Sequence, residues 1–227
     1  MDISIIIPSL NEAAHIRRAI ECAWSAGAVE VIVADGGSTD ATLEIARGLR
    51  CEIVETKPGR AIQQNAAARK ARGDVLLFLH ADTFLEAGAV GQIKAALADP
   101  AAAWGGAFRQ RIEAAGAAYR VLERANALRV RWRRVPYGDQ GLFVRREVFF
   151  RAGEFPAVRL LEDLLLAKKL RQLGPPLLLP GPLHVSARRW KKYGVVRQTL
   201  RNGMLLLLHA CGASPDSLAK LYRRHDE

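Results

Sequence analysis

The chain has 227 residues, 50% of them hydrophobic and 25% charged, and it carries a net charge of +11. That length allows one sizeable hydrophobic core and is short for two independent ones. The composition is ordinary for a soluble globular protein, and no apolar run approaches the ~20 residues that span a bilayer. The excess of positive charge is not ordinary, and its placement is informative.

The positive charge gathers in two stretches of the second half of the chain. The first stretch contains Arg120, Arg124, Arg129, Arg131, Arg133 and Arg134, and the second contains Arg188, Arg189, Lys191, Lys192, Arg197 and Arg201. A basic surface of this kind attracts nucleic acid, an anionic membrane leaflet or phosphorylated small molecules. A solvated basic face is the simpler explanation for any one arginine, but two clusters favour an anionic partner.

The cysteines and the N-terminus bear on the cellular compartment. Cys22, Cys51 and Cys211 are odd in number and lack the spacing of a zinc site or a disulfide framework. They predict small buried side chains in a reducing compartment. The N-terminal sequence MDISIII lacks a basic region and a cleavage site, which is not the pattern of a signal peptide. We therefore expect a cytoplasmic protein.

Short apolar runs alternate with helical patterns through residues 1–82. The predicted strands are Ile3 to Ile7, Val29 to Ala34, Glu52 to Val54 and Val75 to Leu79. Ser9 and Glu12 have the spacing of a capping box, which predicts that the first helix begins there. The apolar runs are continuous rather than alternating, which indicates a parallel sheet covered by helices on both faces. Such a sheet binds ligands at the carboxyl ends of its strands.

The second half of the chain is less regular. Its predicted elements are an edge strand at Trp104 to Ile112, a helix at Ala117 to Arg131, a strand at Leu142 to Val144, and helices at Leu161 to Leu173 and Val195 to Cys211. Leu205 to Leu208 make the last helix apolar on all sides. A packed C-terminal helix is the first interpretation, and an interfacial membrane contact supported by Arg197 and Arg201 is the second.

Polar side chains that a core does not need follow three of the predicted strands. They are Asn11 and Glu12 after the first strand, Asp35 and Asp40 after the second, and His80 and Asp82 after Val75 to Leu79. A carboxylate at this edge can accept hydrogen bonds from a ribose or a base, or hold a hard cation. Gly36 and Gly37 allow close approach of the backbone to a ligand. Each segment alone is also an ordinary turn or helix cap, but together they indicate a binding site.

Two missing motifs narrow the ligand. The first strand is not followed by G-x-G-x-x-G, which disfavours a nicotinamide or flavin dinucleotide, and the chain has no G-x-x-x-x-G-K-[ST] phosphate loop. If phosphates bind here, a divalent cation must offset their charge. Mg²⁺ or Mn²⁺ held by few protein carboxylates and by the phosphates themselves is the usual arrangement.

Three ordered segments resemble the motifs of family 2 inverting glycosyltransferases. They are IIIPSLNE at residues 5–12, VADGGSTD at residues 33–40 and LHADT at residues 79–83. The resemblance implies a GT-A fold: one α/β, Rossmann-like domain with a mostly parallel central sheet between helices and, here, a helical C-terminal tail. The family's third motif is Asp-x-Asp, and its final Asp holds Mn²⁺ or Mg²⁺. Asp82 takes that position, whereas His80 stands where the family has its first Asp.

Four further segments resemble a compact bacterial subgroup that is labelled as radical-SAM- or selenium-associated, or as belonging to arsenosugar biosynthesis. They are GRAIQQN at residues 59–65, YGDQG at residues 137–141, LED at residues 161–163 and SARRW at residues 186–190. The resemblance therefore covers nearly the whole chain. It implies a single domain over 1–227, with a nucleotide-sugar-binding half at 1–100, an acceptor and catalytic half at 101–190 and a helical tail at 191–227.

The resemblance also implies roles for the acidic and basic residues. Inverting transfer needs a base for the acceptor hydroxyl and an electrostatic trap for the departing diphosphate. Asp163 corresponds to the family's base, with Glu162 in support and Asp139 as the second candidate. Both Glu162 and Asp163 would otherwise be acids favoured by a helix N-terminus. Arg188 or Arg189 would stabilise the leaving diphosphate.

The expected donor is a nucleoside-diphosphate sugar, with UDP as the default, and the expected acceptor is a small-molecule or lipid-linked hydroxyl. The residues expected to bind the donor are Pro8, Asn11, Glu12, Asp35, Gly37, Arg60, Gln63, Asn65, His80, Ala81, Gln140, Arg188, Arg189 and Trp190. Trp190 would pack over the nucleotide or anchor its segment. His184 is a further candidate metal ligand, although a lone histidine is more often structural.

Three rival interpretations remain. A sugar-phosphate nucleotidyltransferase would bind the same ligands, but residues 8–12 do not form the Gly-rich, Arg-containing loop of that class. A nucleic-acid-binding protein fits the charge alone, and helix-turn-helix, zinc-finger and RNP patterns are missing. An inactive member of the fold is suggested by His80. The motifs favour the glycosyltransferase, without a nucleic-acid partner and with a peripheral contact to an anionic membrane left open.

Overall fold

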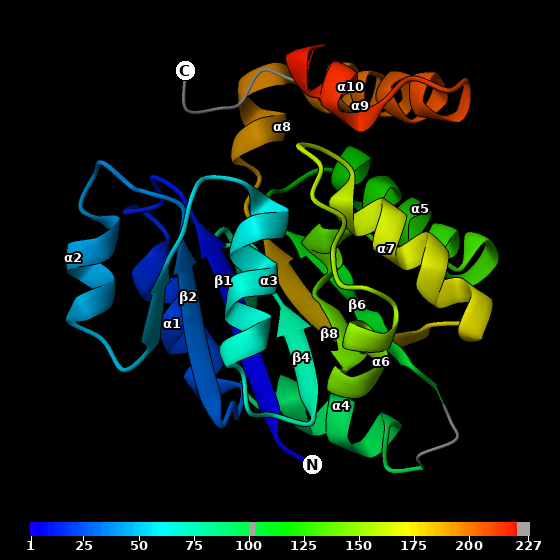
Figure 1. The fold of residues 1–227 in the computed structure, drawn as a ribbon. Coiled ribbons are helices and arrows are strands. Elements are labelled where there is room, and N and C mark those ends of the chain that lie inside the picture. The colour runs from blue at the N-terminus through cyan, green and yellow to red at the C-terminus, as the bar shows by residue number, and fades with distance from the viewer. Residues whose placement is uncertain (100–102, 222–227) are drawn as a thin grey trace.

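The computed structural model describes residues 1–99 and 103–221, which form one eight-stranded sheet with helices on both faces (Figure 1). The strands are β1 (Ile3–Ser9), β2 (Glu30–Asp35), β3 (Glu52–Glu55), β4 (Val75–Phe78), β5 (Thr83–Leu85), β6 (Gly105–Ile112), β7 (Leu142–Arg145) and β8 (Leu177–Val185). Their order in the sheet is β3-β2-β1-β4-β7-β6-β8-β5. Residues 100–102, at the predicted boundary between the halves, and 222–227, in the predicted tail, lie outside the described part.

The helices separate these strands. They are α1 (Ile16–Ser25), α2 (Thr42–Arg47), α3 (Arg60–Lys70), α4 (Ala89–Ala96), α5 (Ala117–Arg133), α6 (Arg146–Arg151), α7 (Glu162–Leu170), α8 (Arg188–Tyr193), α9 (Val195–Ala210) and α10 (Pro215–Leu221). Short 3-10 turns lie at η1 (Gly138–Gln140) and η2 (Arg171–Leu173). The predicted helix at Leu161 to Leu173 is therefore α7 followed by η2.

The N-terminal half is a parallel sheet with apolar residues on both faces. Ile6 in β1 pairs with Ile32 in β2 and with Phe78 in β4, all in parallel register. Alternate residues of β1 face opposite ways, so Ile5 packs on the side of α1 and Ile6 on the side of α3. The continuous apolar runs of the sequence are thus explained by helices on both faces, as Figure 1 shows with α3 in front of the sheet and α1 behind it.

The prediction that a helix begins with a capping box at Ser9 was wrong. β1 continues through Ser9, and α1 begins at Ile16 with no side-chain cap at His15. The Ser9 hydroxyl instead donates to Asp35 Oδ2 over 3.1 Å, and the Glu12 backbone N–H donates to the Thr42 hydroxyl over 2.8 Å. Polar groups of the neighbouring loop take the bonds that a cap would have used.

The prediction of an edge strand at Trp104 to Ile112 was also wrong, because β6 lies between β7 and β8. Two glycines make this position possible. A Cβ at Gly105 would collide with the backbone oxygen of Phe143, and a Cβ at Gly106 with the backbone oxygen of Leu177. Only glycine therefore allows the strands on both sides to approach so closely.

The C-terminal tail packs against the rest of the chain on one side only. Leu205 of α9 is 4% exposed, and Leu206 contacts the cluster formed by Val135 and Leu164, whereas Leu207 is 64% exposed. The prediction of a packed C-terminal helix is therefore correct for one face of α9 and wrong for the other. Within residues 1–99 and 103–221, no helix combines the length and the apolar character needed to cross a bilayer.

Candidate nucleotide-sugar site

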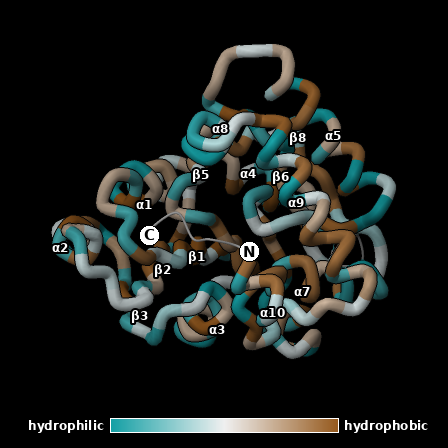
Figure 2. The backbone as a smooth tube through the Cα atoms, turned by 90° about the horizontal axis from the view of Figure 1, so that it is seen from above, coloured by the Kyte–Doolittle hydropathy of each residue, from teal (hydrophilic) through white to brown (hydrophobic). Residues whose placement is uncertain are grey.

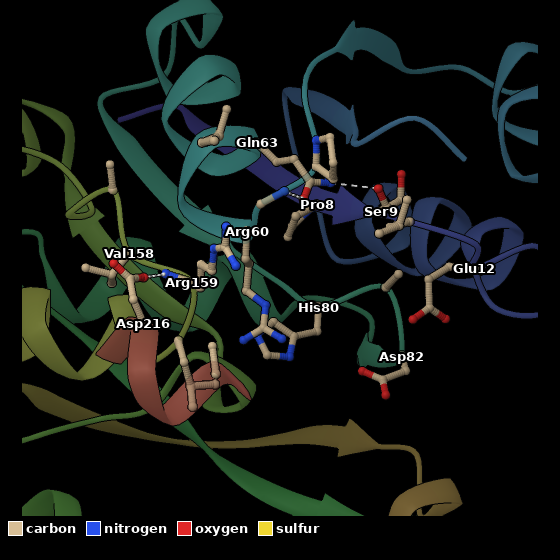
Figure 3. Close-up of a pocket in the computed structure, with 18 of the residues that line it drawn as sticks. Pro8, Ser9, Glu12, Arg60, Gln63, His80, Asp82, Val158, Arg159 and Asp216 are labelled. Atoms are coloured by element: carbon tan, nitrogen blue, oxygen red, sulfur yellow. Dashed lines mark hydrogen bonds between the residues drawn. The ribbon is translucent and has the colours of Figure 1, made fainter. Parts of the chain in front are cut away.

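A cavity of about 780 Å³ lies at the carboxyl ends of β1 and β4, where the sequence placed the binding site. Its volume falls within the range of small-molecule sites. The predicted residues that line it are Pro8, Glu12, Arg60, Gln63, His80, Ala81, Asp82, Arg188 and Arg189. Figure 3 shows how the side chains of Arg60, Gln63, His80 and Asp82 converge on it from different elements.

The remaining predicted residues lie outside the lining of this cavity. They are Asn11, Asp35, Gly37, Asn65, Asp139, Gln140, Glu162, Asp163 and Trp190. Several of them hold the cavity in shape through hydrogen bonds, and others lie in a second cluster around η1 and the start of α7.

Asp35 organises the loop after β2. Its Oδ1 accepts the backbone N–H groups of Gly37 and Ser38, each over 2.8 Å, and its Oδ2 accepts the hydroxyls of Ser9 and Ser38. A carboxylate has about four lone-pair sites, and all four are used. Gly37 adopts a φ of +92°, which glycine tolerates without strain. The buried carboxylate therefore shapes the loop and holds no spare acceptor for a base.

Asn11 ties the first loop to the second. Its backbone N–H donates to the Ser38 hydroxyl over 3.0 Å, and its Oδ1 accepts the Thr39 backbone N–H over 2.9 Å. Asn11 has a φ of 53°, a left-handed conformation that asparagine adopts more readily than most residues. The two motifs that looked separate in the sequence thus form one hydrogen-bonded rim.

Helix α3 closes the floor of the cavity. The Gln63 amide donates to the backbone oxygens of Ser9 and Ala34 over 2.7 and 2.9 Å. Asn65 exchanges two hydrogen bonds with the backbone of Phe155, at 2.8 and 3.1 Å. Gln63 lines the cavity and joins three elements, whereas Asn65 fixes the segment that precedes α7.

The side chains of Glu12, Asp82 and Arg188 lie together at one corner of the cavity, beyond the end of β4. Arg188 Nη2 lies 2.8 Å from Glu12 Oε1 and 3.5 Å from Asp82 Oδ2. Burial raises the pKa of the Glu12 carboxyl, although Arg188 partly opposes this. Burial acts on Asp82 in the same direction, yet His80 and the cations Arg189 and Arg188 hold its pKa below the ordinary value. Asp82 is therefore ionised at neutral pH.

This corner fits a hard divalent cation. Glu12 Oε2 is buried and has no hydrogen-bond partner, and the Asp82 carboxylate lies on the same arginine. Oxygen ligands of this kind are those that Mg²⁺ and Mn²⁺ take. The described residues contain no cluster of three or more acidic, His or Cys ligands, so most ligands of a cation would have to come from the donor and from water. His184 lies elsewhere, 3.0 Å from Glu86.

His80 is half-buried at the cavity, and its desolvation there lowers its pKa to about 3, with Arg60 acting in the same direction. The imidazole is therefore neutral at physiological pH. A Cβ added to Gly138 would lie 3.0 Å from His80 Nε2 and 3.2 Å from Asp163 Oδ2. His80 of the third motif and the candidate base Asp163 thus both lie beside Gly138.

The acidic pair at the start of α7 is divided between two partners. Asp163 Oδ2 accepts the Gly138 backbone N–H over 2.6 Å. Glu162 is 1% exposed and lies 3.1 Å from Arg60 Nη1. Burial raises the pKa of Glu162, and Arg60 opposes the rise. The pair therefore connects η1 to α3 instead of acting only as helix-terminal charge.

Asp139 lies in a second buried network around η1. Burial raises its pKa, although Arg129 opposes the rise, and its Oδ1 has no hydrogen-bond partner. Arg129 donates to Gln140 Oε1 over 2.7 Å and lies over the Tyr137 ring. Gln140 is fully buried in this network. The role of this half-buried arginine was missed in the sequence, where Arg129 looked like one member of a basic cluster.

The cavity also has a wall that the sequence did not suggest. Residues 157–160 and the helix α10 line it opposite the sheet, and Lys220 is among the lining residues. Figure 3 shows Arg159 and Asp216 on this wall. The Arg159 backbone N–H donates to Asp216 Oδ1 over 3.0 Å. Trp190 lies in α8 between the corner arginines and the tail. Nothing in the local pattern of the tail marks these contacts.

Comparison with known proteins assigns the chain that carries this site to a protein family. A profile described as Glycosyl transferase family 2 matches residues 4–160. The chain belongs to this family. The first and third of the family 2 motifs therefore line the cavity described above, and the second is hydrogen-bonded to the first. The GT-A fold inferred from these motifs is the fold observed.

The family 2 relatives with curated descriptions differ in length from this chain. A PGL/p-HBAD biosynthesis glycosyltransferase of Mycobacterium bovis is 27% identical over 87% of the chain and 79% of the relative. The succinoglycan biosynthesis protein ExoA of Rhizobium meliloti is 51% identical over 21% of the chain and 16% of its own length. The uncharacterized glycosyltransferase YfnE of Bacillus subtilis is 33% identical over 36% of the chain and 23% of its length. The chain thus spans under a quarter of two of these relatives.

Solved structures share the fold. Staphylococcus aureus TarS superposes with a TM-score of 0.64 at 16% identity, over 86% of this chain and 38% of TarS. The mannosyltransferase PcManGT of Pyrobaculum calidifontis, in complex with GDP-Man and Mn²⁺, has a TM-score of 0.59 at 26% identity, over 81% of this chain and 56% of PcManGT.

Proposed function

We propose that the chain is a metal-dependent inverting glycosyltransferase, which moves a sugar from a nucleoside-diphosphate donor to an acceptor hydroxyl. The observation that carries this proposal is the corner of the cavity where Glu12, Asp82 and Arg188 meet. It combines a carboxylate pair for a cation with arginines for a diphosphate. The complex of the related PcManGT with GDP-Man and Mn²⁺ supports the same combination of ligands.

In this proposal, Asp82 holds the divalent cation, with Glu12 beside it. When bound, Mn²⁺ or Mg²⁺ supplies positive charge that offsets the diphosphate. Arg188 spans the two carboxylates in the structure described here and partly neutralises them. A diphosphate would give Arg188 and Arg189 better partners, since guanidinium groups bind phosphate in a bidentate manner.

Asp163 is the proposed base. The transfer is a single displacement in which Asp163 takes the proton of the acceptor hydroxyl, the hydroxyl oxygen bonds to the anomeric carbon, and the bond to the diphosphate breaks. Asp163 lies beside Gly138, and so does His80, which lines the cavity. Asp139 stays the second candidate, since its Oδ1 has no hydrogen-bond partner.

The donor base and the acceptor are narrower parts of the same proposal. We take UDP as the default donor nucleotide, because a structure of the related TarS fold is a complex with UDP-GlcNAc, although PcManGT was solved with GDP-Man. The acceptor is a small-molecule or lipid-linked hydroxyl. Membership of the compact bacterial subgroup rests on residues 59–65, 137–141, 161–163 and 186–190.

The test is a thermal-shift panel of nucleoside-diphosphate sugars with and without Mn²⁺, followed by an assay of donor hydrolysis. A donor that binds only the native state raises the unfolding midpoint. We expect the rise to require metal, and we expect free nucleoside diphosphate as the product. Release of pyrophosphate would instead indicate a nucleotidyltransferase, and a nucleotide response that needs no metal would contradict the role of Asp82.

A further inference from the structure

Helix α9 turns an apolar stripe toward the solvent. Val196 is 71% exposed, Leu200 69%, Met204 52% and Leu207 64%. Spacings of three and four residues place these side chains on one side of the helix. Leu205, on the opposite side, is 4% exposed. The face of the helix that carries Leu205 packs against the protein. The apolar stripe on the opposite face does not.

The charge around this stripe has one sign. From residue 188 to residue 215 the chain contains six lysines and arginines and no aspartate or glutamate. Lys191, Lys192 and Arg197 are exposed beside the stripe. In a symmetric contact, a second copy of the chain would place the same cations opposite these. Like-charge repulsion therefore disfavours a contact between two stripes. An anionic bilayer surface offers both negative charge and apolar depth.

A second exposed stripe lies on α5. Val121 is 63% exposed, Leu128 42% and Trp132 79%, at spacings of seven and four residues. Arg124 and Arg131 are exposed at its border. Tryptophan with flanking cations is enriched at membrane–water interfaces. Helices α5 and α9 lie near one another in both Figure 1 and Figure 2, and Leu206 of α9 packs against the cluster that contains Val135, which follows α5.

We propose that α9, together with α8 and the end of α5, is a docking surface for an anionic lipid bilayer. The helix would lie in the plane of the headgroups, since it has 16 residues and no described helix is fit to span a membrane. Arg188 of α8 and Lys220 of α10, on either side of α9, both line the cavity. If the proposed glycosyltransferase function holds, this surface presents the cavity to acceptors anchored in the bilayer.

The test is cosedimentation of the full chain, without nucleotide or metal, with vesicles of phosphatidylcholine alone or mixed with phosphatidylglycerol. We expect binding to the anionic vesicles that weakens with added salt. Replacing Leu200 and Leu207 with glutamate should weaken it at least about tenfold, because each leucine loses its burial. Arg197→Gln should weaken it by about fivefold, the contribution of one cation near an anionic surface.

Leu173→Glu is the matched control, since Leu173 is 60% exposed in η2 and outside the tail. It should bind vesicles like the unaltered chain. Equal binding of the unaltered chain and the Leu200→Glu/Leu207→Glu variant would overturn the proposal. So would light scattering that shows a dimer of the unaltered chain and a monomer of that variant, because the stripe would then join two copies. Vesicle binding and metal-dependent nucleotide binding are separate readouts, so either proposal can fail alone.

Discussion

The two sides of the cavity are built differently. On the side of the parallel sheet, Asp35 uses all its acceptor sites and Gln63 bonds two backbone oxygens, so these two side chains have fixed partners. On the opposite side, Arg188 reaches two carboxylates, and Asp216 holds Arg159 by a single bond to the backbone. The first side is a preorganised floor, and the second consists of long side chains that can exchange partners when a ligand enters.

The largest effect should come from the base, which belongs to neither side alone. Asp163→Asn keeps the shape of the side chain but removes the proton acceptor, so we expect a loss of about 10⁴-fold in transfer rate with donor binding retained. A donor titration and a rate assay measure the two quantities. Asp139→Asn should leave most of the rate, and the reverse ranking would move the base into the buried η1 network.

Asp82→Ala should lower the rate by about 10³-fold, as expected when one electrostatic contact to the leaving group is lost. It should also abolish the metal-dependent rise in the unfolding midpoint. Treatment of the unaltered chain with a chelator should give the same result. Glu52→Ala, at an exposed position of β3, is the matched control and should change neither quantity.

Gln63→Ala tests the rigidity of the floor. The backbone oxygens of Ser9 and Ala34 would lose their donor, so we expect the free energy of unfolding to fall by about 3 kcal/mol. Chemical denaturation measures the change, and Lys70→Ala at the exposed end of the same helix should cost less than about 0.5 kcal/mol. A small effect of Gln63→Ala would mean that the two sides do not differ in rigidity.

The smallest effect is expected at Asp139. Burial raises its pKa in the folded chain, so the folded state binds this proton more tightly than the unfolded state. The carboxyl therefore costs nothing well below its unfolded pKa and destabilises the fold increasingly as the pH rises through the folded pKa. Asp139→Asn should stabilise the chain by about 1 kcal/mol at neutral pH and lose that gain in acid. A gain that grows in acid would reverse the assigned sign.

The sequence was a good guide to the floor and a poor one to the opposite side. Continuous apolar runs predicted the parallel sheet because burial on both faces is recorded locally in each strand. The capping box failed because Ser9 and Glu12 have partners in another loop. The inner place of β6 depends on how closely β7 and β8 approach Gly105 and Gly106, which no local pattern records.

The residues that complete the cavity illustrate the same limit. Asp216 lies 57 residues from its partner Arg159, and Arg188 lies 176 residues from Glu12. Only tertiary packing brings such pairs together. Asp82, by contrast, was predicted as a metal ligand because LHADT at residues 79–83 resembles the family's Asp-x-Asp motif, and that role stays a prediction.

A substitution at Gly138 offers a way to identify the acceptor. A Cβ at Gly138 would lie 3.0 Å from His80 Nε2 and 3.2 Å from Asp163 Oδ2, so a single added methyl group would push against both side chains. Gly138→Ala would therefore uncouple occupancy of the donor cavity from the proton-transfer geometry. Such a variant would bind its ligands without converting them. It could therefore be used to isolate the natural substrates from a cell extract.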